Sequence, residues 1–286
     1  MLHSSFGSFL KSRAAGLAGP IALILAEDEV ELASTLSHHL AKGFRTVIAL
    51  VAPDATLPDQ PTVHFVAHDV LSEDALTHAT NQLVAAAPGQ WIYTGYNAEY
   101  LYFPFAETRS VGELLAFHAQ ERREAMPATV IDLYASDLTR HPDAVDRDTA
   151  HFDRAGYFAL ARKDAAANWA PLERQADLYG GLRWRFEEHV PWEKRRIDRI
   201  ALFCARPGVI MRPDFTLSVA EMNTIACPWH HNLTAAVLSF RAAKALRSNP
   251  DSRHAIASFQ WRNSVPFAWS SQQLLDLGFI EPGQWF

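Results

Sequence analysis

Polar side chains follow short apolar runs at three places in the first hundred residues. Each apolar run has the composition of a buried strand, and the next residues carry carboxylates, an amide or turn-forming prolines. When strands and helices alternate, the carboxyl ends of parallel strands meet at one edge of the sheet, where ligands bind. We therefore expect ligand-binding groups in three loops: Ala26 to Glu29, Ala52 to Asp54 and Gly95 to Glu99.

The elements that must position these loops alternate along the chain. Apolar residues at spacings of three and four after Val30 predict a helix, and Gly43 stands where its C-cap belongs. Strands are predicted at Ile21 to Leu25, Val47 to Val51, Thr62 to Val66, Trp91 to Thr94 and Val130 to Tyr134, and helices at Ser72 to Ala87 and from Ser110, where Glu113 completes a capping box. This alternation predicts an α/β fold with a mostly parallel central sheet flanked by helices.

The second half of the chain has weaker patterns. Residues 139–168 are polar and charge-rich, which predicts an exposed, partly irregular insertion. Short strands are expected at Ile200 to Ala205 and near Leu182 to Phe186, followed by a helix from Asn232 to Leu246 and an aromatic tail. These pieces form an expected C-terminal α+β extension.

Composition narrows the class of protein. The chain has 286 residues, of which 49% are hydrophobic, and its formal net charge is −6 without a long basic run, which argues against nucleic acid as a partner. No apolar stretch approaches the ~20 residues that cross a bilayer, and the first twenty residues lack an export-signal core. We expect a cytoplasmic protein without a transmembrane segment, in which peripheral membrane contact stays open and Cys204 and Cys227 are unpaired thiols.

Three segments resemble the glycosyltransferase family 2 group and its family 92-like relatives. Ala22 to Glu29 (ALILAEDE) is similar to their opening strand and turn, and Leu36 to Phe44 (LSHHLAKGF) is similar to the signature that ends their first helix. Trp91 to Pro104 (WIYTGYNAEYLYFP) stands where these enzymes have an Asp-x-Asp-Glu-Phe motif. The resemblance implies a GT-A fold and transfer of a sugar from a nucleotide diphosphate sugar to a hydroxyl acceptor, such as a glycan.

The third segment departs from the family motif. Glu99 and Tyr100 fit its Glu-Phe pair, but Tyr96, Asn97 and Ala98 occupy the positions of the metal-binding carboxylates. The resemblance therefore implies that Asn97 and Glu99 form a weakened site for Mn²⁺ or Mg²⁺, in which the diphosphate must supply the missing oxygen ligands. It also assigns the nucleotide to Glu27, Asp28, Glu29, Asp54 and Asn97.

Two later motifs supply the remaining site candidates. In Asp177 to Arg185 (DLYGGLRWR), Arg183 is a candidate partner of the diphosphate and Asp177 is the candidate acceptor base, with Glu187 and Glu188 as rivals. The alternative for this segment is a simple β-turn between strands. In Cys227 to Asn232 (CPWHHN), a histidine before a helix stays neutral, so His231, or else His230, is predicted as a metal ligand or catalytic group. The alternative is a helix-capping turn.

The leading hypothesis is a glycosyltransferase built from one GT-A-like domain over residues 21–286, after an N-terminal extension over residues 1–20. Residues 21–135 would bind the nucleotide sugar and residues 136–286 the acceptor. Two alternatives stay open: a non-catalytic binding or scaffold protein that has lost the metal-binding Asp pair, and a metal-independent transferase in which Arg and His replace the cation.

Overall fold

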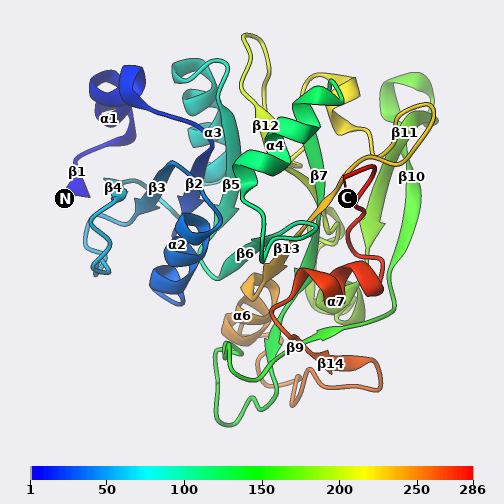
Figure 1. Cartoon of the computed structure of the whole chain (residues 1–286). Helices are drawn as coiled ribbons and strands as arrows, with labels where there is room; N and C mark the ends of the chain where they lie inside the picture. Colours follow the sequence, from blue (N-terminus) through cyan, green and yellow to red (C-terminus); the bar gives the residue numbers. More distant parts are fainter. Residues whose placement is uncertain (1, 286) are drawn as a thin grey trace.

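A computed structural model describes residues 2–285 of the chain. Over this range the central sheet has nine strands in the order β1-β4-β3-β2-β5-β12-β7-β13-β6 (Figure 1). Their bounds are β1 Leu2–His3, β2 Ile21–Leu25, β3 Thr46–Val51, β4 Val63–Ala67, β5 Trp91–Tyr96, β6 Glu99–Tyr102, β7 Ala125–Asp132, β12 Asp198–Cys204 and β13 Ala235–Ser239. The chain is therefore an α/β protein.

The sheet is mostly parallel. Strands β1, β4, β3, β2 and β5 run the same way, and β13 runs parallel to β7. Strand β12 is antiparallel to both β5 and β7, and β6 is antiparallel to β13. Since β12 reverses direction between them, β5 and β7 point the same way, and their carboxyl ends share one edge with those of β2, β3 and β13.

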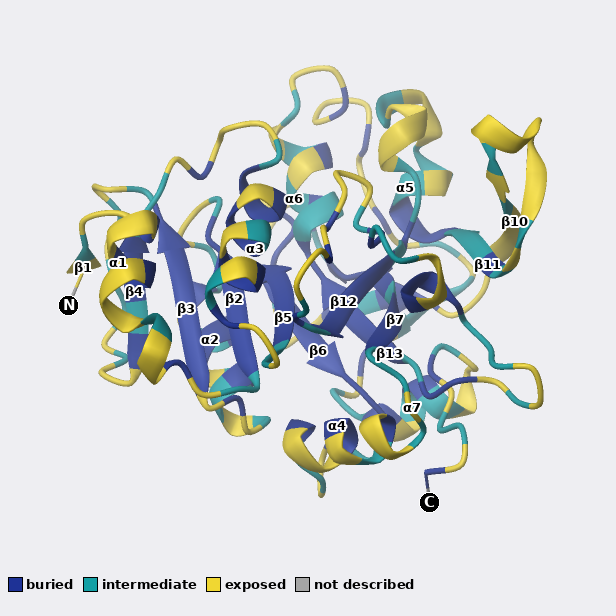
Figure 2. Cartoon of the chain, turned by 90° about the horizontal axis from the view of Figure 1, so that it is seen from above, coloured by how far each residue is buried: buried dark blue, intermediate teal, exposed yellow. Residues whose placement is uncertain are grey.

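Side-chain burial explains why these segments are strands. Every residue of β2 and β3 is buried, as expected for parallel strands covered on both faces. Alternate residues of β2 point to opposite sides: Leu23 belongs to one apolar cluster, and Ala22 and Ile24 belong to the other. The sheet therefore separates two cores, and Figure 2 shows its strands in dark blue between helices whose outer surfaces are exposed.

Helices cover both faces of the sheet. The helices are α1 Phe6–Arg13, α2 Leu32–Ala41, α3 Ala75–Ala86, α4 Val111–Gln120, α5 Gly181–Arg185, α6 Arg241–Ser248 and α7 Ser271–Asp276. Helices α1 and α3 bury Phe9 and Leu76 with Leu23, whereas α2 and α4 pack Leu36 and Leu114 against the opposite face. The predicted capping box of α4 is confirmed. None of the helices in residues 2–285 is both long and apolar enough to span a membrane.

Three predicted elements differ in the structure. The segment expected as a strand near Leu182 to Phe186 is helix α5, and the helix expected from Asn232 to Leu246 is strand β13 followed by α6. All five residues of β13 are buried between β7 and β6, so burial in the sheet outweighs the helix preference of its alanines. Helix α3 begins at Ala75 rather than after Ser72.

The remaining strands form two small sheets beside the central one. They are β8 Tyr134–Ala135, β9 Ala150–Asp153 and β14 Ser264–Pro266 in one sheet, and β10 Phe158–Asp164 and β11 Ala170–Tyr179 in the other. Residues 139–168 are thus mixed: Ala150, Phe152 and Asp153 are buried, whereas β10 is mostly exposed. Figure 2 shows the β10–β11 hairpin extending away from the central sheet. At the other end, residues 2–13 add β1 and α1 to the sheet and its cover.

Candidate functional site

The carboxyl edge of the central sheet gathers most of the predicted site residues. Strands β2, β3, β5, β7 and β13 end there, and the antiparallel strands β6 and β12 begin there. Strand β6 therefore begins at Glu99, and β12 at Asp198, beside the carboxyl ends of neighbouring strands. Because of this arrangement, groups far apart in sequence lie next to each other at this edge.

Asn97 joins the first and third predicted loops. It lies in the turn between β5 and β6, is 1% exposed, and its Oδ1 accepts a hydrogen bond of 3.0 Å from the Glu27 backbone N–H. Its Nδ2 donates to Asp28 Oδ1 at 2.5 Å and to the Val30 carbonyl at 2.9 Å. The expectation that these two loops lie side by side is confirmed, and the Asn97 amide holds the acidic loop in place.

Glu99 is enclosed at the same edge. It is 1% exposed, and its carboxylate lies 2.6 Å from Arg199 Nη2 and accepts bonds from Ser239 Oγ at 3.0 Å and from the Tyr96 N–H at 3.0 Å. Burial alone would raise the pKa of Glu99, but Arg199 and the Tyr96 N–H hold it below its usual range. Glu99 is therefore a charged group whose oxygens are already engaged with protein donors.

Two basic side chains from α6 close over the acidic loop. Arg241 donates from Nε and Nη2 to the two Glu27 oxygens at 2.7 and 2.6 Å, and its guanidinium lies 3.9 Å from the centre of the Tyr96 ring. Lys244 Nζ lies 2.6 Å from Asp28 Oδ2. Burial opposes protonation of Arg241, but the bonds to Glu27 raise its pKa above the ordinary value. Each of these two carboxylates thus has a cation as partner.

The second predicted loop meets the first through Glu29. Glu29 Oε1 accepts a hydrogen bond of 2.6 Å from the Thr56 backbone N–H, which lies just beyond β3. Asp54 is exposed in the turn after β3. The three loops selected from the sequence are therefore neighbours at one edge, and Asp54 is open to solvent there.

Asp177 lies in a cluster of alternating charges beside the start of β12. Arg162 Nε donates to Asp177 Oδ1 at 2.7 Å, and Arg196 Nε lies 3.2 Å from the same oxygen. Both arginines also contact Asp198, at 2.5 Å each, and the Leu178 N–H bonds to Asp198 at 2.7 Å. The candidate base is therefore a carboxyl group held between two guanidinium groups.

Arg183 meets a carboxylate that the sequence reading overlooked. Asp132, the last residue of β7, is 1% exposed, and its Oδ1 lies 3.4 Å from Arg183 Nε. Its Oδ2 accepts from the Leu182 N–H at 3.0 Å, whereas Oδ1 has no hydrogen-bond partner within residues 2–285. Burial raises the pKa of Asp132. A Cβ on Gly181 would lie 2.9 Å from Asp132 Oδ2, so the glycine lets the backbone come close to this carboxylate.

His230 and His231 lie at the opposite edge of the sheet. They precede β13, whose amino end faces away from Asn97 and Glu99, and no helix follows them directly. His231 is exposed and pairs with Ala226, whereas His230 lies 3.1 Å from Cys227 Sγ and 3.6 Å from Glu121. The structure therefore does not bring His231 to the predicted metal site, because the assumed helix is a strand. Cys204 and Cys227 are both free.

The rival bases have other partners. Glu187 pairs with Arg195 at 2.8 Å, and Glu188 lies 3.8 Å from His189. Both belong to a short 3-10 turn after α5. Neither contact connects these glutamates to the carboxyl-edge residues described above.

The donor set at Asn97 and Glu99 does not fit a divalent cation. Mn²⁺ and Mg²⁺ need several oxygen ligands with free lone pairs, whereas Glu99 is buried against Arg199 and the Asn97 oxygen accepts from Glu27. Over the described part of the chain, no three His, Cys, Asp or Glu side chains are grouped so as to hold a metal ion. The cations near these two residues are side chains of the protein, such as Arg199 and Arg241.

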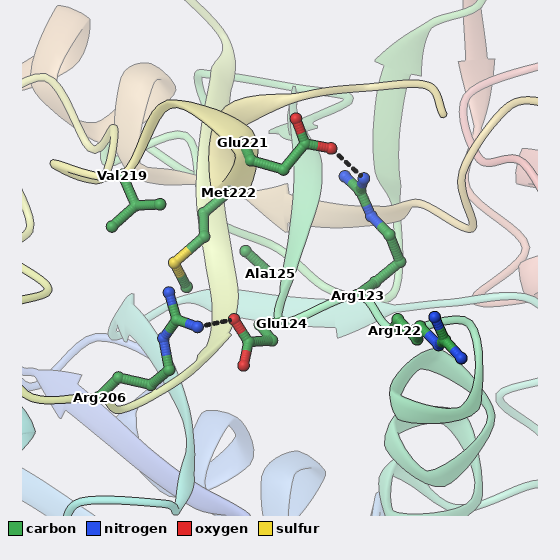
Figure 3. A pocket seen from close by; sticks show the side chains of 8 residues that line it. All are labelled: Arg122, Arg123, Glu124, Ala125, Arg206, Val219, Glu221 and Met222. Carbon is green, nitrogen blue, oxygen red and sulfur yellow. Dashed lines mark hydrogen bonds and ion pairs between the residues drawn. The ribbon is translucent and has the colours of Figure 1, made fainter. Parts of the chain in front are cut away.

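A cavity of about 270 Å³ lies at the amino edge, away from these groups. Figure 3 shows its charged lining, in which Arg206 faces Glu124 and Arg123 faces Glu221 at the start of β7. These pairs are 2.5 and 3.1 Å apart. Two ion pairs thus line this cavity, which does not belong to the carboxyl-edge site.

Sequence reasoning missed four residues of the carboxyl edge: Asp132, Arg199, Arg241 and Lys244. One signal was available, since Arg241 and Lys244 are three residues apart, directly after the apolar run Ala235–Ser239. If that run had been predicted as a strand, the helix with Arg241 and Lys244 would have been expected to begin at the carboxyl edge. No protein-family model matches the sequence, and no curated protein matches it significantly. We therefore infer the function from the geometry of this edge.

Proposed function

We propose that this protein is a GT-A-like glycosyltransferase that binds a nucleotide diphosphate sugar through cationic side chains instead of a divalent metal. The observation that carries this proposal is the pairing of Arg241 with Glu27 and of Lys244 with Asp28 around Asn97. In the resembling family, this is the place where carboxylates hold the metal that neutralises the diphosphate. Here the cations are supplied by the first turn of α6.

The chemistry of the two cations suits a diphosphate. A guanidinium presents a planar fork of donors that matches two phosphate oxygens, and an ammonium adds a compact positive charge. Both side chains are ordered by carboxylates that are partly exposed, 28% for Glu27 and 41% for Asp28. A diphosphate can therefore displace these carboxylates into water and take over the cations without unfolding the edge.

The sugar-transfer step requires a base for the acceptor hydroxyl. Asp177 is the predicted base, but its carboxylate is already engaged in ion pairs with two arginines. Asp132 has the opposite environment, because burial raises its pKa. We therefore assign the base role to Asp132 ahead of Asp177, with movement of Arg183 opening the way to the acceptor.

A second candidate function is a non-catalytic binding protein. The pairing of Asp177 and the enclosure of Asp132 favour this alternative, since Asp177 is engaged with two arginines and Asp132 is buried. Such a protein would still bind the nucleotide at Arg241 and Lys244. A cytoplasmic location belongs to either version of the proposal, whereas a glycan acceptor belongs to the transferase alone.

Calorimetry with UDP, GDP, CDP and their glucose or mannose conjugates tests the proposal in a buffer containing EDTA. We expect one nucleotide class to bind wild-type protein, and Arg241→Gln to weaken that binding at least about tenfold, because a charge-assisted contact to phosphate is lost. Arg206→Gln is the matched control. Arg206 also forms a partly exposed ion pair, but with Glu124 at the amino edge.

The outcomes separate the alternatives. Binding in EDTA that Arg241→Gln removes and Arg206→Gln retains supports the cationic site, and release of free sugar or a glycoside from the bound conjugate then supports transfer. Binding without turnover with any acceptor supports the non-catalytic version. Binding that appears only after Mn²⁺ is added, or the absence of nucleotide binding in both conditions, overturns the proposal.

A further inference from the structure

A second cavity lies beside the β10–β11 hairpin, outside the carboxyl-edge site. Its volume is about 430 Å³, within the usual range for small-molecule sites. The hairpin, strand β7 and the segment after α7 all contribute to its walls, and Figure 1 shows the hairpin beside α7. The lining residues that matter here are Thr129, Arg154, Tyr157, Phe158, Leu178 and Phe279.

The lining is polar and apolar in nearly equal parts, and its apolar part continues onto the surface. Phe158 lines the cavity and is 37% exposed, and its ring lies 4.8 Å from that of Trp184, which is 36% exposed. On the other side, Tyr157 packs edge-on against Phe279 at 4.9 Å. Such rings retain apolar surface in water, so an apolar ligand that covers them gains free energy.

Two polar groups of the cavity lack partners. The Tyr157 hydroxyl is buried without a hydrogen bond to any residue in the described range, which is costly for a group of this kind. Arg154 is exposed at the cavity, and no carboxylate among residues 2–285 forms an ion pair with it. This distinguishes Arg154 from Arg162, Arg183 and Arg185, each of which has an acidic partner.

The shape of the cavity depends on a nearby glycine. Gly180 has φ of +151°, and a Cβ there would lie 2.3 Å from the Tyr157 ring. Tyr157 can occupy its position only because residue 180 has no side chain. The Tyr157 ring is thus held at the cavity wall by backbone geometry.

We propose that this cavity binds a small amphipathic carboxylate, with the apolar chain or ring against Phe158, Leu178 and Phe279 and the carboxylate on Arg154. Charge complementarity selects an anion, because Arg154 is the cation of the lining and no acidic side chain lines the cavity within the described residues. The site goes beyond the proposed function and does not depend on nucleotide binding.

The test uses three probes of equal length and different charge: octanoate, octanol and octylammonium. Calorimetry should rank octanoate as the tightest and octylammonium as the weakest. Arg154→Gln should weaken octanoate about tenfold, as expected for one lost charge-assisted hydrogen bond, and leave octanol unchanged. Arg140→Gln is the control, since Arg140 is also exposed but does not line the cavity.

A second variant tests the location independently of charge. Ala159 is exposed on β10 and lines the cavity, so Ala159→Trp should fill the space and abolish binding of octanoate and octanol. Equal binding of octylammonium and octanoate, no binding of any probe, or binding that survives Ala159→Trp would each overturn the proposal. Nucleotide binding in EDTA should be the same in Arg154→Gln and wild-type protein, which separates this test from that of the proposed function.

Discussion

The carboxyl edge of the sheet and the cavity beside the β10–β11 hairpin satisfy their polar groups in opposite ways. At the edge, Glu27, Asp28 and Glu99 each have a cationic partner within 2.7 Å. At the cavity, Arg154 has no ion pair in the described chain and the Tyr157 hydroxyl has no hydrogen bond there. These three carboxylates of the edge are thus paired without a ligand, whereas the arginine of the cavity is not.

This difference determines how a ligand can bind in each region. A ligand at the edge must exchange with existing ion pairs, so its affinity depends on competition between phosphate and carboxylate for Arg241 and Lys244. A ligand at the cavity adds contacts that are missing and covers exposed apolar surface. The edge should therefore favour highly charged ligands, and the cavity should accept ligands with a single charge.

The largest expected effect comes from breaking the buried pair at the edge. Arg199→Met leaves the Glu99 carboxylate buried without its partner, and we expect it to lower the free energy of unfolding by about 3–5 kcal/mol. The matched variant Arg206→Met breaks a pair whose side chains are 42% and 40% exposed and should cost no more than about 1 kcal/mol. Urea unfolding measures both. Equal losses would contradict the view that the edge is a closed, buried network.

The next effect is the dependence of stability on pH. Burial lowers the pKa of His39, which packs under the edge, and that of His118 to about 4 each. In the unfolded chain these histidines have the ordinary pKa of about 6.5 and become protonated below it, whereas in the native chain they stay neutral down to about pH 4. The free energy of unfolding should therefore fall as the pH drops from 6.5 to 4. His39→Gln should reduce this slope by up to about 1.4 kcal/mol per pH unit, as one proton per molecule requires. An unchanged slope would show that His39 titrates normally in the native protein.

The smallest of the three effects concerns the cavity. Gly180→Ala places a side chain against Tyr157 and forces a backbone conformation that only glycine adopts easily, so it should cost about 1–3 kcal/mol. Gly7→Ala is the control, because a Cβ at residue 7 meets no atom within 4 Å, and it should change stability by less than about 1 kcal/mol. Thermal unfolding measures both, and octanoate binding should weaken only in Gly180→Ala. Equal stability of the two variants would contradict the claim that Tyr157 needs a glycine at residue 180.

The first half of the fold was predictable because its strands are continuous apolar runs. Ile21–Leu25 was predicted with its observed bounds, since parallel strands buried on both faces need no polar residues. In the second half, the prediction was wrong where a short apolar segment fitted both the helix and the strand periodicity. Ala235–Ser239 is alanine-rich and leads directly into α6, so only its neighbours β7 and β6 make it a strand.

The candidate site was predictable in position but not in partners. Strand-end loops can be selected from sequence, and Asn97 does join Glu27 and Asp28 as neighbours. The pairing of Glu27 with Arg241 spans more than two hundred residues and follows from the strand order, which local patterns do not contain. The same limit led to the placement of His231 at the wrong edge.

Phosphorus NMR of a bound nucleotide diphosphate sugar tests the central claim most directly. The ligand identified by calorimetry is titrated with protein in EDTA, and the β-phosphorus signal is followed. We expect wild-type protein and Arg206→Gln to shift or broaden this signal, because the guanidinium contacts the diphosphate without a metal. Arg241→Gln should leave the signal as it is in the free ligand. If Arg241→Gln shifts the signal as much as wild-type protein does, or if the signal moves only when Mg²⁺ is added, the cationic site is contradicted.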